Sequence, residues 1–284
     1  MRYPTIALSF SLLACAALGV DDGWKPLWNG KDFSGWDMFQ AIPQASLEVP
    51  GVKREASGKY LEPIGLNRDP LGVFTVGEVD GRPAICVSGK TFGTITTKEA
   101  FGNFHLRMQV KWGEKKYAPK LAAPRDCGLL YFCHGPLGVE HGQWPRSVEF
   151  QIQEHDMGDL YALMTKVTVN ARHEGRLWLY DPKAEPILFE QKAPISNRCV
   201  KLGDPEKPHG EWNTLDLICL GSDSIHIVNG VVVMRLHGAQ RLDGPAPAPI
   251  AAGQISLQTE GAEVFYRDVM LRPISTVPPE WAEK

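Results

Sequence analysis

Hydrophobic and polar residues alternate along much of the chain with a period of two, which is typical of β-strands that bury one face. The alternation runs through residues 104–111, 147–153, 214–220, 224–233, 254–258 and 263–271. Asn229-Gly230 stands between two β-branched runs and predicts a tight hairpin, because a type I′ turn needs positive φ at both central residues. No segment keeps a helical period over several turns. The pattern therefore predicts an all-β sandwich.

Three long segments interrupt this alternation, at residues 40–70, 113–126 and 182–210. Loops of this length in a compact domain are usually functional or disordered, and around a curved sheet they would form the rim of a cleft. No internal repeat is visible, and all-β sandwiches commonly exceed about 200 residues as one domain. We therefore expect a single domain over residues 21–276, followed by a C-terminal tail at residues 277–284.

The start of the chain has the features of an export signal. Arg2 gives a positive start, residues 6–13 form a short apolar run, and Ala14-Cys15-Ala16 offers a small-residue cleavage site. Leu12-Leu13-Ala14-Cys15 also resembles a bacterial lipobox, in which Cys15 would carry a lipid. We interpret residues 1–20 as a signal peptide of an exported protein, which is periplasmic, extracellular or lipid-anchored at the bacterial envelope. No other segment approaches a transmembrane span, so membrane contact is expected only through such an anchor.

The composition is that of a folded protein without a strong charge. The 284 residues are 43% hydrophobic and 22% charged, with a formal net charge of −3. The lack of a basic surplus argues against binding to nucleic acid through bulk charge. The chain also contains eight Trp. Indole rings can stack on the C–H faces of sugars, although most Trp side chains in proteins belong to the core.

The cysteines give no clear disulfide framework. There are six of them: Cys15, Cys86, Cys127, Cys133, Cys199 and Cys219. Cys127 and Cys133 would lie about 20 Å apart on one extended strand and cannot bridge there. Cys199 could pair with Cys219, although nothing in the sequence fixes this, and a zinc site of Cys127, Cys133 and His134 lacks the usual C-x-x-C spacing. We expect most of these cysteines to be small buried apolar residues.

The segment richest in polar chemistry is residues 149–156, which read Glu-Phe-Gln-Ile-Gln-Glu-His-Asp. Strand alternation places Glu149, Gln151 and Gln153 on one face and the apolar residues on the other. Such a polar face can line a sugar-binding cleft, or it can be the solvated outer side of a sheet. Glu149-x-Gln151-x-x-Glu154 is similar to the E-x-D-x-x-E signature of family 16 glycoside hydrolases, with Gln for the central Asp. The final Glu would reach the same face only through a bulge.

Three motifs resemble those of the 3-keto-disaccharide hydrolase domain family. Residues 23–36 are similar to its pLFNGKDLsGW start, and Glu211-Trp212-Asn213 with Val228-Asn229-Gly230 resembles its GEWN…NG hairpin. Residues 253–269 resemble its closing G-x-I-x-LQ-x-x-G…F-R-N-I, with Asp268 where Asn is usual. The motifs stand in the family's order over nearly the whole mature chain. The resemblance implies a concanavalin A-like jelly-roll β-sandwich of two antiparallel sheets, here with long loop insertions.

The resemblance also implies cleavage of glycosides whose C3 hydroxyl has been oxidised to a ketone. The ketone acidifies the C2 proton, so a base can remove it and the resulting enediolate can expel the C1 oxygen. Water then adds back, or the unsaturated sugar leaves. Such a site needs a base, a donor for the enolate oxygen and an acid for the leaving group. The expected partner is therefore an oligosaccharide or a 3-keto-glycoside.

We assign candidate catalytic roles to Glu149, His155 and Glu154, with Glu149 or His155 as the base. The candidate substrate-binding residues are Gln151, His134, His141, Arg107, Tyr131, Trp144 and Gln258. Among them, the two glutamines would orient sugar hydroxyls, and the arginine would donate to an enolate. The aromatic residues, together with Trp178, would stack on sugar rings unless they belong to the core.

Two other functions stay open from the sequence. A conventional retaining glycoside hydrolase would use Glu149 and Glu154, with their carboxyls about 5–5.5 Å apart. A noncatalytic sugar-binding module would have the same architecture, because sandwich folds host both lectins and enzymes. No cofactor is expected, although a divalent ion could bind the carboxylates and imidazole of Glu149, Glu154, His155 and Asp156. The chain lacks the G-x-S-x-G, phosphate-loop and H-E-x-x-H motifs.

Overall fold

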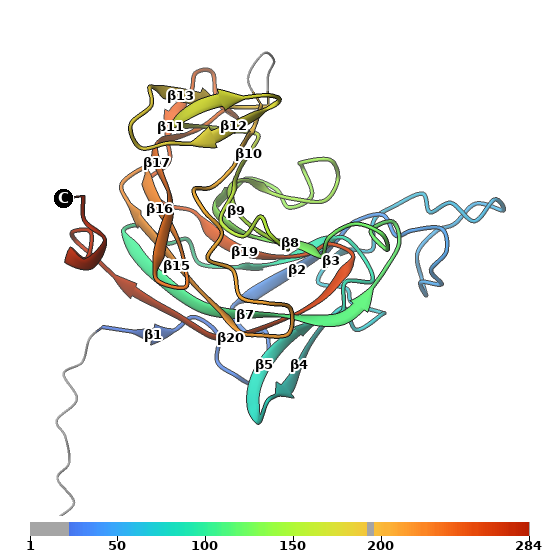
Figure 1. Ribbon diagram of the computed structural model, residues 1–284. Helices are drawn as coiled ribbons and strands as arrows, with labels where there is room; N and C mark the ends of the chain where they lie inside the picture. The colour runs from blue at the N-terminus through green and yellow to red at the C-terminus, as the bar shows by residue number, and fades with distance from the viewer. Residues whose placement is uncertain (1–22, 192–195, 284) are drawn as a thin grey trace, which may run out of the picture.

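The computed structural model describes residues 23–191 and 196–283. In this part of the chain two antiparallel β-sheets pack face to face, and the larger sheet curves around the smaller one (Figure 1). This confirms the predicted fold class. The predicted signal peptide, residues 1–20, with its Cys15 lies outside the described residues. Within the described ranges, no helix has the length and apolar character that a membrane crossing requires.

The smaller sheet carries most of the polar residues discussed below. Its strand order is β14 (Arg198–Cys199), β10 (Leu160–Leu163), β9 (Arg146–Gln153), β8 (Asp126–His134), β19 (Gln254–Thr259), β6 (Gly93–Thr97), β2 (Trp36–Gln40) and β3 (Gly65–Leu66). One face of this sheet packs on the larger sheet. The opposite face, which we call the free face, is bordered only by loops.

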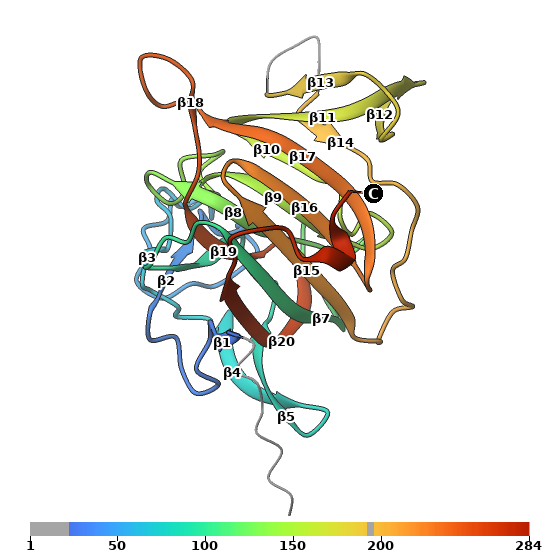
Figure 2. The ribbon, with the colours of Figure 1, turned by 90° about the vertical axis from the view of Figure 1, so that its left-hand side faces the viewer.

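The larger sheet forms the other layer. Its strand order is β12 (Leu177–Tyr180), β11 (Thr165–Glu174), β17 (Val231–Arg241), β16 (Asp223–Val228), β15 (Asn213–Leu220), β7 (Phe104–Lys116), β20 (Ala262–Pro273), β5 (Arg82–Val87) and β4 (Phe74–Val79). Three short strands pair beside this path: β1 (Lys25–Pro26) with β20, β13 (Pro186–Phe189) with β11, and β18 (Ala248–Pro249) with β17. The 3-10 turn η1 (Pro279–Trp281) lies against the outer face of this sheet, where Trp281 packs on Ile218 (Figure 2).

The strands predicted from alternation are all present as β7, β9, β15, β16, β17, β19 and β20. The predicted hairpin joins β16 to β17, with φ of 49° at Asn229 and 80° at Gly230. The apolar members of each alternating run fill the space between the sheets. Examples with 0% exposure are Met108, Phe150 and Leu217. Burial of each such side chain stabilises the fold by about 1.5–3 kcal/mol, which explains why the alternating pattern decides the architecture.

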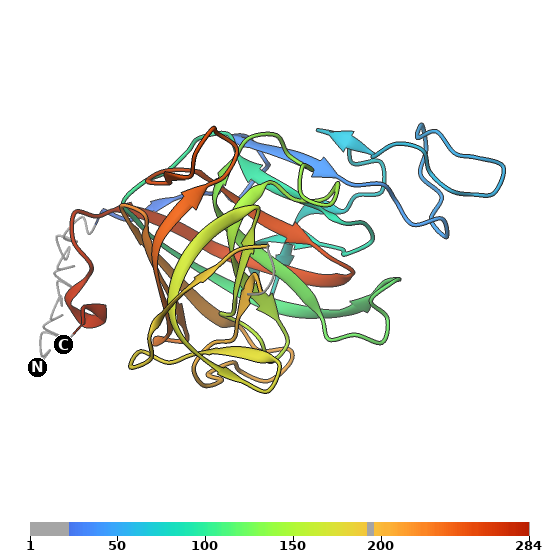
Figure 3. The same cartoon turned by 90° about the horizontal axis from the view of Figure 1, so that it is seen from above.

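The segments predicted as insertions are only partly irregular. Residues 41–64 project away from the sandwich and pack around their own small cluster of Val49, Val52, Tyr60 and Ile64 (Figure 3). The 182–210 segment contains β13 and β14, so its reading as an unstructured loop is wrong in part. Strands of two to four residues are not predicted from the sequence, because so short a segment does not show the alternation of hydrophobic and polar residues.

The cysteines of the described residues are all free thiols. The suggested pairing of Cys199 with Cys219 is therefore wrong. Cys127, Cys133, Cys199 and Cys219 are buried, and Cys86 is half-buried. The expectation that they act mainly as small apolar residues is confirmed for these positions.

A buried polar network ties the two sheets together at His226. The His226 Nδ1 atom lies 3.0 Å from the Gly158 carbonyl, and its Nε2 atom lies 2.9 Å from the Tyr131 hydroxyl. The Tyr131 hydroxyl is also hydrogen-bonded to Ser224 Oγ at 2.7 Å. With a proton on Nδ1, the neutral imidazole satisfies both neighbours and leaves no polar atom unpaired. Burial lowers the pKa of His226 to about 3.

We predict that His226 makes the protein less stable in acid. The unfolded chain takes up a proton near the ordinary histidine pKa of about 6.5, whereas the folded chain does so only near 3. The free energy of unfolding should therefore fall by up to about 1.4 kcal/mol per pH unit between these values and level off below them. Urea unfolding of wild type and His226→Gln measures this. The variant should be less stable at neutral pH, and its stability should depend less on pH. His237→Gln, which changes a half-exposed histidine, is the control. The prediction is contradicted if the free energy of unfolding depends on pH equally in wild type and in His226→Gln.

Candidate functional site

A row of side chains crosses the free face of the smaller sheet at the level of Glu149. Strand pairing places Glu149 opposite Leu130 on one side and opposite Tyr161 on the other. Leu130 is in turn paired with Ser256, which is paired with Thr96. The row therefore continues without a gap from β10 through β9, β8 and β19 to β6.

A second, parallel row holds Gln258, Gly128 and Gln151. Gly128 is paired with Gln151. A Cβ atom on Gly128 would lie 2.2 Å from Glu149 Oε1 and 2.6 Å from Gln258 Oε1. The absence of a side chain at Gly128 thus makes the space in which the Glu149 carboxyl and the Gln258 amide meet. Glu149, Gln151 and Gln258 are 5%, 6% and 1% exposed, so this polar floor is sheltered from bulk water.

A cluster of one lysine and two further carboxyls lies beside Glu149. Lys120, from the loop between β7 and β8, contacts Asp126 Oδ2 and donates to Glu260 Oε1 at 2.8 Å. Asp126 Oδ1 is buried without a hydrogen-bond partner. Burial raises the pKa of Glu260 to about 7, and the neighbouring Asp126 adds to this effect. One ammonium group thus faces the buried carboxyls of Glu149 and Asp126 and the half-buried carboxyl of Glu260.

This imbalance fixes the charge state of Glu149. Burial raises the pKa of Glu149 well above its usual range, and the carboxylates of Glu260 and Asp126 raise it further. Lys120 and Gln258 oppose the shift only in part. Two like charges in a low-dielectric site cannot both stay ionised without a cation for each. Burial and the neighbouring carboxylates thus favour the protonated form of Glu149.

The opposite flank of Glu149 is formed by Tyr161 and Arg198. Burial raises the pKa of Tyr161 to about 12, so its hydroxyl stays protonated. The Arg198 guanidinium lies 5.5 Å from the centre of the Tyr161 ring and donates to Asp159 Oδ2 at 2.7 Å. Asp156 accepts from the same guanidinium at 2.8 Å. These contacts hold the phenol beside Glu149.

Apolar side chains also lie on the free face. Leu130, Cys133, Trp144 and Leu163 form one buried cluster, with Phe92 and Tyr161 half-buried against it. The Phe92 and Trp144 rings are stacked with their centres 6.1 Å apart. A polar floor beside aromatic surface is the combination that a sugar ring, with its hydroxyl edge and C–H faces, needs for binding.

The structure brings only some of the predicted residues to this site. Glu149, Gln151, Gln258 and Trp144 share the free face, but Glu154 does not join them. Glu154 lies in the turn after β9 and accepts from Arg125 Nη1 at 2.8 Å and from its backbone N–H at 2.8 Å. Burial would raise the pKa of Glu154, but these hydrogen bonds and the Arg125 charge outweigh it and lower the pKa. Glu154 therefore fastens the turn to the start of β8.

The three candidate histidines are also dispersed. The His155 side chain is 87% exposed, and its backbone N–H donates to Glu206 Oε2 at 2.8 Å. His155 and Glu154 line a separate cavity of about 470 Å³ at the end of the sheet. The His141 side chain is 77% exposed, 3.0 Å from Glu140. His134 is half-buried at the far end of β8, where Nδ1 lies 2.9 Å from the Phe132 carbonyl.

Three predictions are wrong because the residue lies away from the free face. Arg107 is on the outer face of the larger sheet, where it donates to Asp216 Oδ1 at 2.7 Å and lies over the Trp24 ring. The whole sandwich separates it from Glu149. Tyr131 is fully buried between the sheets in the His226 network and cannot stack on a ligand. Trp178 lies in β12 against Phe189, also outside the site.

Several residues of the site escaped the sequence analysis. They are Lys120, Asp126, Gly128, Tyr161, Arg198 and Glu260. Part of the signal was present, because Gln254, Ser256, Gln258 and Glu260 are polar at every second position. Lys120 and Arg198 come from a loop and a two-residue strand, where no local pattern indicates which way a side chain points.

The proposed metal site is not formed by these residues. Among the described residues, no group of three or more His, Cys, Asp or Glu side chains is arranged to hold a metal ion. The side chains of Glu149, Glu154 and His155 lie in different surroundings and do not converge on one point.

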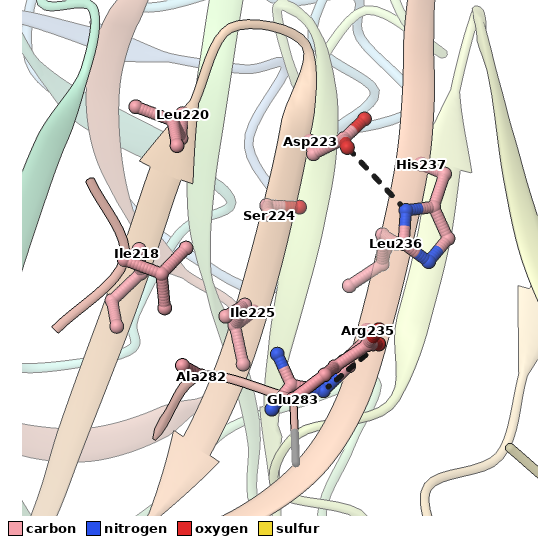
Figure 4. Close-up of a pocket in the computed structure, with 11 residues that line it drawn as sticks. Ile218, Leu220, Asp223, Ser224, Ile225, Arg235, Leu236, His237, Ala282 and Glu283 are labelled. Atoms are coloured by element: carbon pink, nitrogen blue, oxygen red, sulfur yellow. Dashed lines mark hydrogen bonds and ion pairs between the residues drawn. The ribbon is translucent and has the colours of Figure 1, made fainter. Parts of the chain in front are cut away.

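Another cavity, of about 320 Å³, lies between β15–β17 and the C-terminal residues (Figure 4). Its rim carries the Asp223–His237 and Arg235–Glu283 ion pairs, and it belongs to the larger sheet.

Comparisons with known proteins give the family that the chain matches and the solved structures that are similar to it. A family model described as "3-keto-alpha-glucoside-1,2-lyase-like domain" matches residues 23–272. No curated protein matches the chain in sequence. Two crystal structures, each called "putative glycosyl hydrolase" and both from Parabacteroides distasonis ATCC 8503, are similar to the chain. One is 18% identical, with TM-score 0.46, and covers 89% of this chain and 94% of its own. The other is 20% identical, with TM-score 0.43, and covers 73% and 93%. The carbohydrate binding module CBM66 from Bacillus subtilis is 8% identical, with TM-score 0.41, and covers 70% and 91%.

We predict that Lys120→Met destabilises the protein most at alkaline pH. Without the ammonium group, Asp126 and Glu260 are buried charges with no partner, which costs about 3–5 kcal/mol. Lowering the pH should relieve this loss, because protonated carboxyls need no cation. Urea unfolding at about pH 8 and about pH 5.5 measures the difference. Lys115→Met, at a 67% exposed side chain 3.4 Å from Glu263, should change stability by less than about 1 kcal/mol at either pH. A loss in Lys120→Met that does not vary with pH would contradict the charge balance described here.

Proposed function

The chain belongs to the 3-keto-alpha-glucoside-1,2-lyase-like domain family over residues 23–272, and on this premise we propose that it cleaves a 3-keto-glucoside by elimination. The observation that carries the proposal is the burial of the Glu149 carboxyl beside Asp126 and Glu260, which share one lysine, because this environment favours the protonated form of Glu149. A buried carboxylic acid that keeps its proton at neutral pH is suited to general-acid catalysis. The substrate class itself comes from the family.

The elimination needs two proton transfers, and the free face offers a group for each. The C2–H bond breaks and its proton goes to a carboxylate, for which Asp126, with its unpartnered Oδ1, is our candidate. The electron pair of that bond first forms the C2=C3 enolate, with negative charge on the C3 oxygen. The enolate then re-forms the C3 carbonyl and makes the C1=C2 double bond while the C1–O bond breaks. The leaving oxygen takes the proton of Glu149. Addition of water to the unsaturated ketone then completes a net hydrolysis.

The remaining groups would orient the sugar and stabilise the enolate. The Tyr161 hydroxyl, adjacent to Glu149 in the strand pairing, is the candidate donor to the C3 oxygen as negative charge develops there. Gln151 and Gln258 offer amide groups to the hydroxyls. The burial of this floor supports the mechanism, because hydrogen bonds to a developing charge are stronger where water is excluded.

The geometry argues against a retaining mechanism that uses Glu149 and Glu154. That mechanism needs a second carboxyl about 5–5.5 Å from the first, on the same side of the sugar. Glu154, the candidate for this role, is bound to Arg125 in the turn beyond the strand. A noncatalytic sugar-binding module is the alternative in a different class, and it would use the same free face without turnover.

Export of the chain belongs to the proposal as well. It is supported by the signal-like sequence of residues 1–20. Mass spectrometry of the mature N-terminus would distinguish ordinary cleavage from lipidation at Cys15. A protein that keeps residues 1–20 would contradict the proposed export.

We predict that Glu149→Gln lowers the turnover of a 3-keto-disaccharide by about 10²–10⁴-fold, the usual contribution of a general acid. The amide keeps the shape of the side chain but has no proton to give. The rate is measured as release of reducing sugar, with the unoxidised disaccharide in parallel, and circular dichroism checks the fold. The wild type should not cleave the unoxidised sugar.

Glu154→Gln is the matched control, since it changes the same group outside the site. It should keep most of the turnover while lowering stability. Loss of activity in both variants, with cleavage of the unoxidised sugar, would support the retaining glycosidase and overturn the elimination. Sugar binding without any turnover would support the module.

A further inference from the structure

A cavity of ligand size lies on the outer face of the larger sheet, where the proposed function makes no use of it. Its volume is about 320 Å³, within the range of about 300–1,000 Å³ that is usual for small-molecule sites. Strands β15, β16 and β17 form one wall, and Val277, Ala282 and Glu283 form the other (Figure 4). The cavity and Glu149 lie on opposite sides of the sandwich.

Side chains from β15 and β16 make one half of the cavity apolar. They are Ile218 and Leu220 on β15 and Ile225 on β16 (Figure 4). Ile218 and Ile225 belong to one buried cluster with Trp281, which holds this half in place. Strand pairing sets Ile218 opposite Ile225 and Ile225 opposite Arg235. An apolar row of two residues thus ends at a cation.

Arg235 on β17 gives the other half of the cavity a positive charge. Its side chain is 16% exposed, and its guanidinium donates to the Trp281 carbonyl at 2.6 Å. The two carboxylates at the cavity are more exposed, at 56% for Asp223 and 73% for Glu283, so water and salt screen them more strongly. Asp223 also accepts from the backbone N–H of Gly238 at 2.8 Å. The least screened charge at the cavity is therefore that of the arginine.

Glu283 shows where an anionic group can bind. Its Oε1 atom lies 3.6 Å from Arg235 Nε, which is an ion pair too long for a hydrogen bond. An exposed pair of this kind contributes little to stability, so another carboxylate can take the place of Glu283. The His237 side chain, on the same strand as Arg235, is 46% exposed and marks a part of the cavity that is open to solvent.

We infer that this cavity binds a medium-chain carboxylate, with its apolar chain over Ile225 and Leu220 and its carboxylate on Arg235 in place of Glu283. Neighbouring strands lie about 4.8 Å apart, so the row from Ile218 to Arg235 spans roughly 10 Å. A medium-length chain covers this span, whereas a shorter acid leaves the apolar end empty. Apolar walls with a few oriented polar groups are the usual character of a small-molecule site. This site does not depend on the reaction proposed above.

Calorimetric titration with octanoate tests the site. We expect octanoate to bind the wild type with a dissociation constant below about 1 mM. Butyrate has four fewer CH₂ groups and should bind at least about tenfold more weakly. Octylamine carries a positive charge on a chain of the same length, and it should not bind in this range because it cannot pair with Arg235.

Three variants test the role of Arg235. Arg235→Met keeps an unbranched side chain but removes its charge, and it should weaken octanoate binding at least about tenfold. Arg241→Met is the matched control, because it removes a cation from the same strand outside the cavity, and it should keep the affinity. Glu283→Gln should tighten binding about two- to fivefold, because no carboxylate of the chain then competes for Arg235.

The site is overturned if octanoate does not bind below about 1 mM, if octylamine binds equally well, or if Arg235→Met and Arg241→Met bind octanoate alike. Circular dichroism checks that each variant folds. Should Arg235→Met fail to fold, Glu283→Gln decides, since its mostly exposed side chain can be changed without loss of the fold. Tighter binding by Glu283→Gln supports the site, and unchanged affinity overturns it.

Discussion

Carboxyl groups buried without enough positive charge are the constraint on which the site depends. Lys120 is shared by Asp126 and Glu260, and Glu149 lies next to both with no cation of its own. An ionised carboxylate in such a place would lose its hydration without compensation, so the proton stays on Glu149. A fold usually avoids this arrangement. Its presence on a sheltered polar floor is what gives the protein an acid at neutral pH.

The sandwich tolerates this arrangement because its core is well packed and its main buried polar network is satisfied. Strand alternation sends Phe150 into the core and Glu149 to the free face, and Gly128 leaves room for the carboxyl between two strands. On the inner side, the His226 network pairs every polar atom it buries. The loops then close the site from its edges, with Lys120 on one side and Trp144 on the other. Two of the buried side-chain atoms without a hydrogen-bond partner, Asp126 Oδ1 and Gln258 Oε1, lie where the chemistry is proposed.

The sequence could predict the structural features that depend on the local alternation of hydrophobic and polar residues. Hydrophobic alternation identified the main strands, and it placed Glu149 and Gln151 on one polar face. It could not decide which sheet a strand joins, and for that reason Arg107 was assigned to the wrong side of the sandwich. Nor could it separate a core aromatic such as Tyr131 from an exposed one, because both alternate in the same way. Lys120 reaches the site through tertiary packing of a loop, for which the chain carries no local pattern.

The hairpin motif of the family resemblance lies away from the proposed chemistry, whereas the closing motif contributes Gln258 and Glu260 to it. Asn213 Oδ1 accepts from Asn229 Nδ2 at 2.8 Å and from the backbone N–H of Lys207 at 2.8 Å, which fixes the loop before β15. The Trp212 ring lies 3.8 Å from the Arg267 guanidinium on the outer face of the larger sheet. The hairpin motif therefore stabilises the scaffold, whereas the closing motif also reaches the free face.

The protonation state of Glu149 tests the central claim most directly. The carboxyl carbon of Glu149 can be followed by ¹³C NMR in glutamate-labelled protein, with Glu149→Gln to assign the signal, from about pH 4 to pH 9. We predict the chemical shift of a protonated carboxyl at about pH 7. A signal that titrates near the ordinary glutamate pKa of about 4.3 would show an ionised Glu149 and contradict its role as the acid.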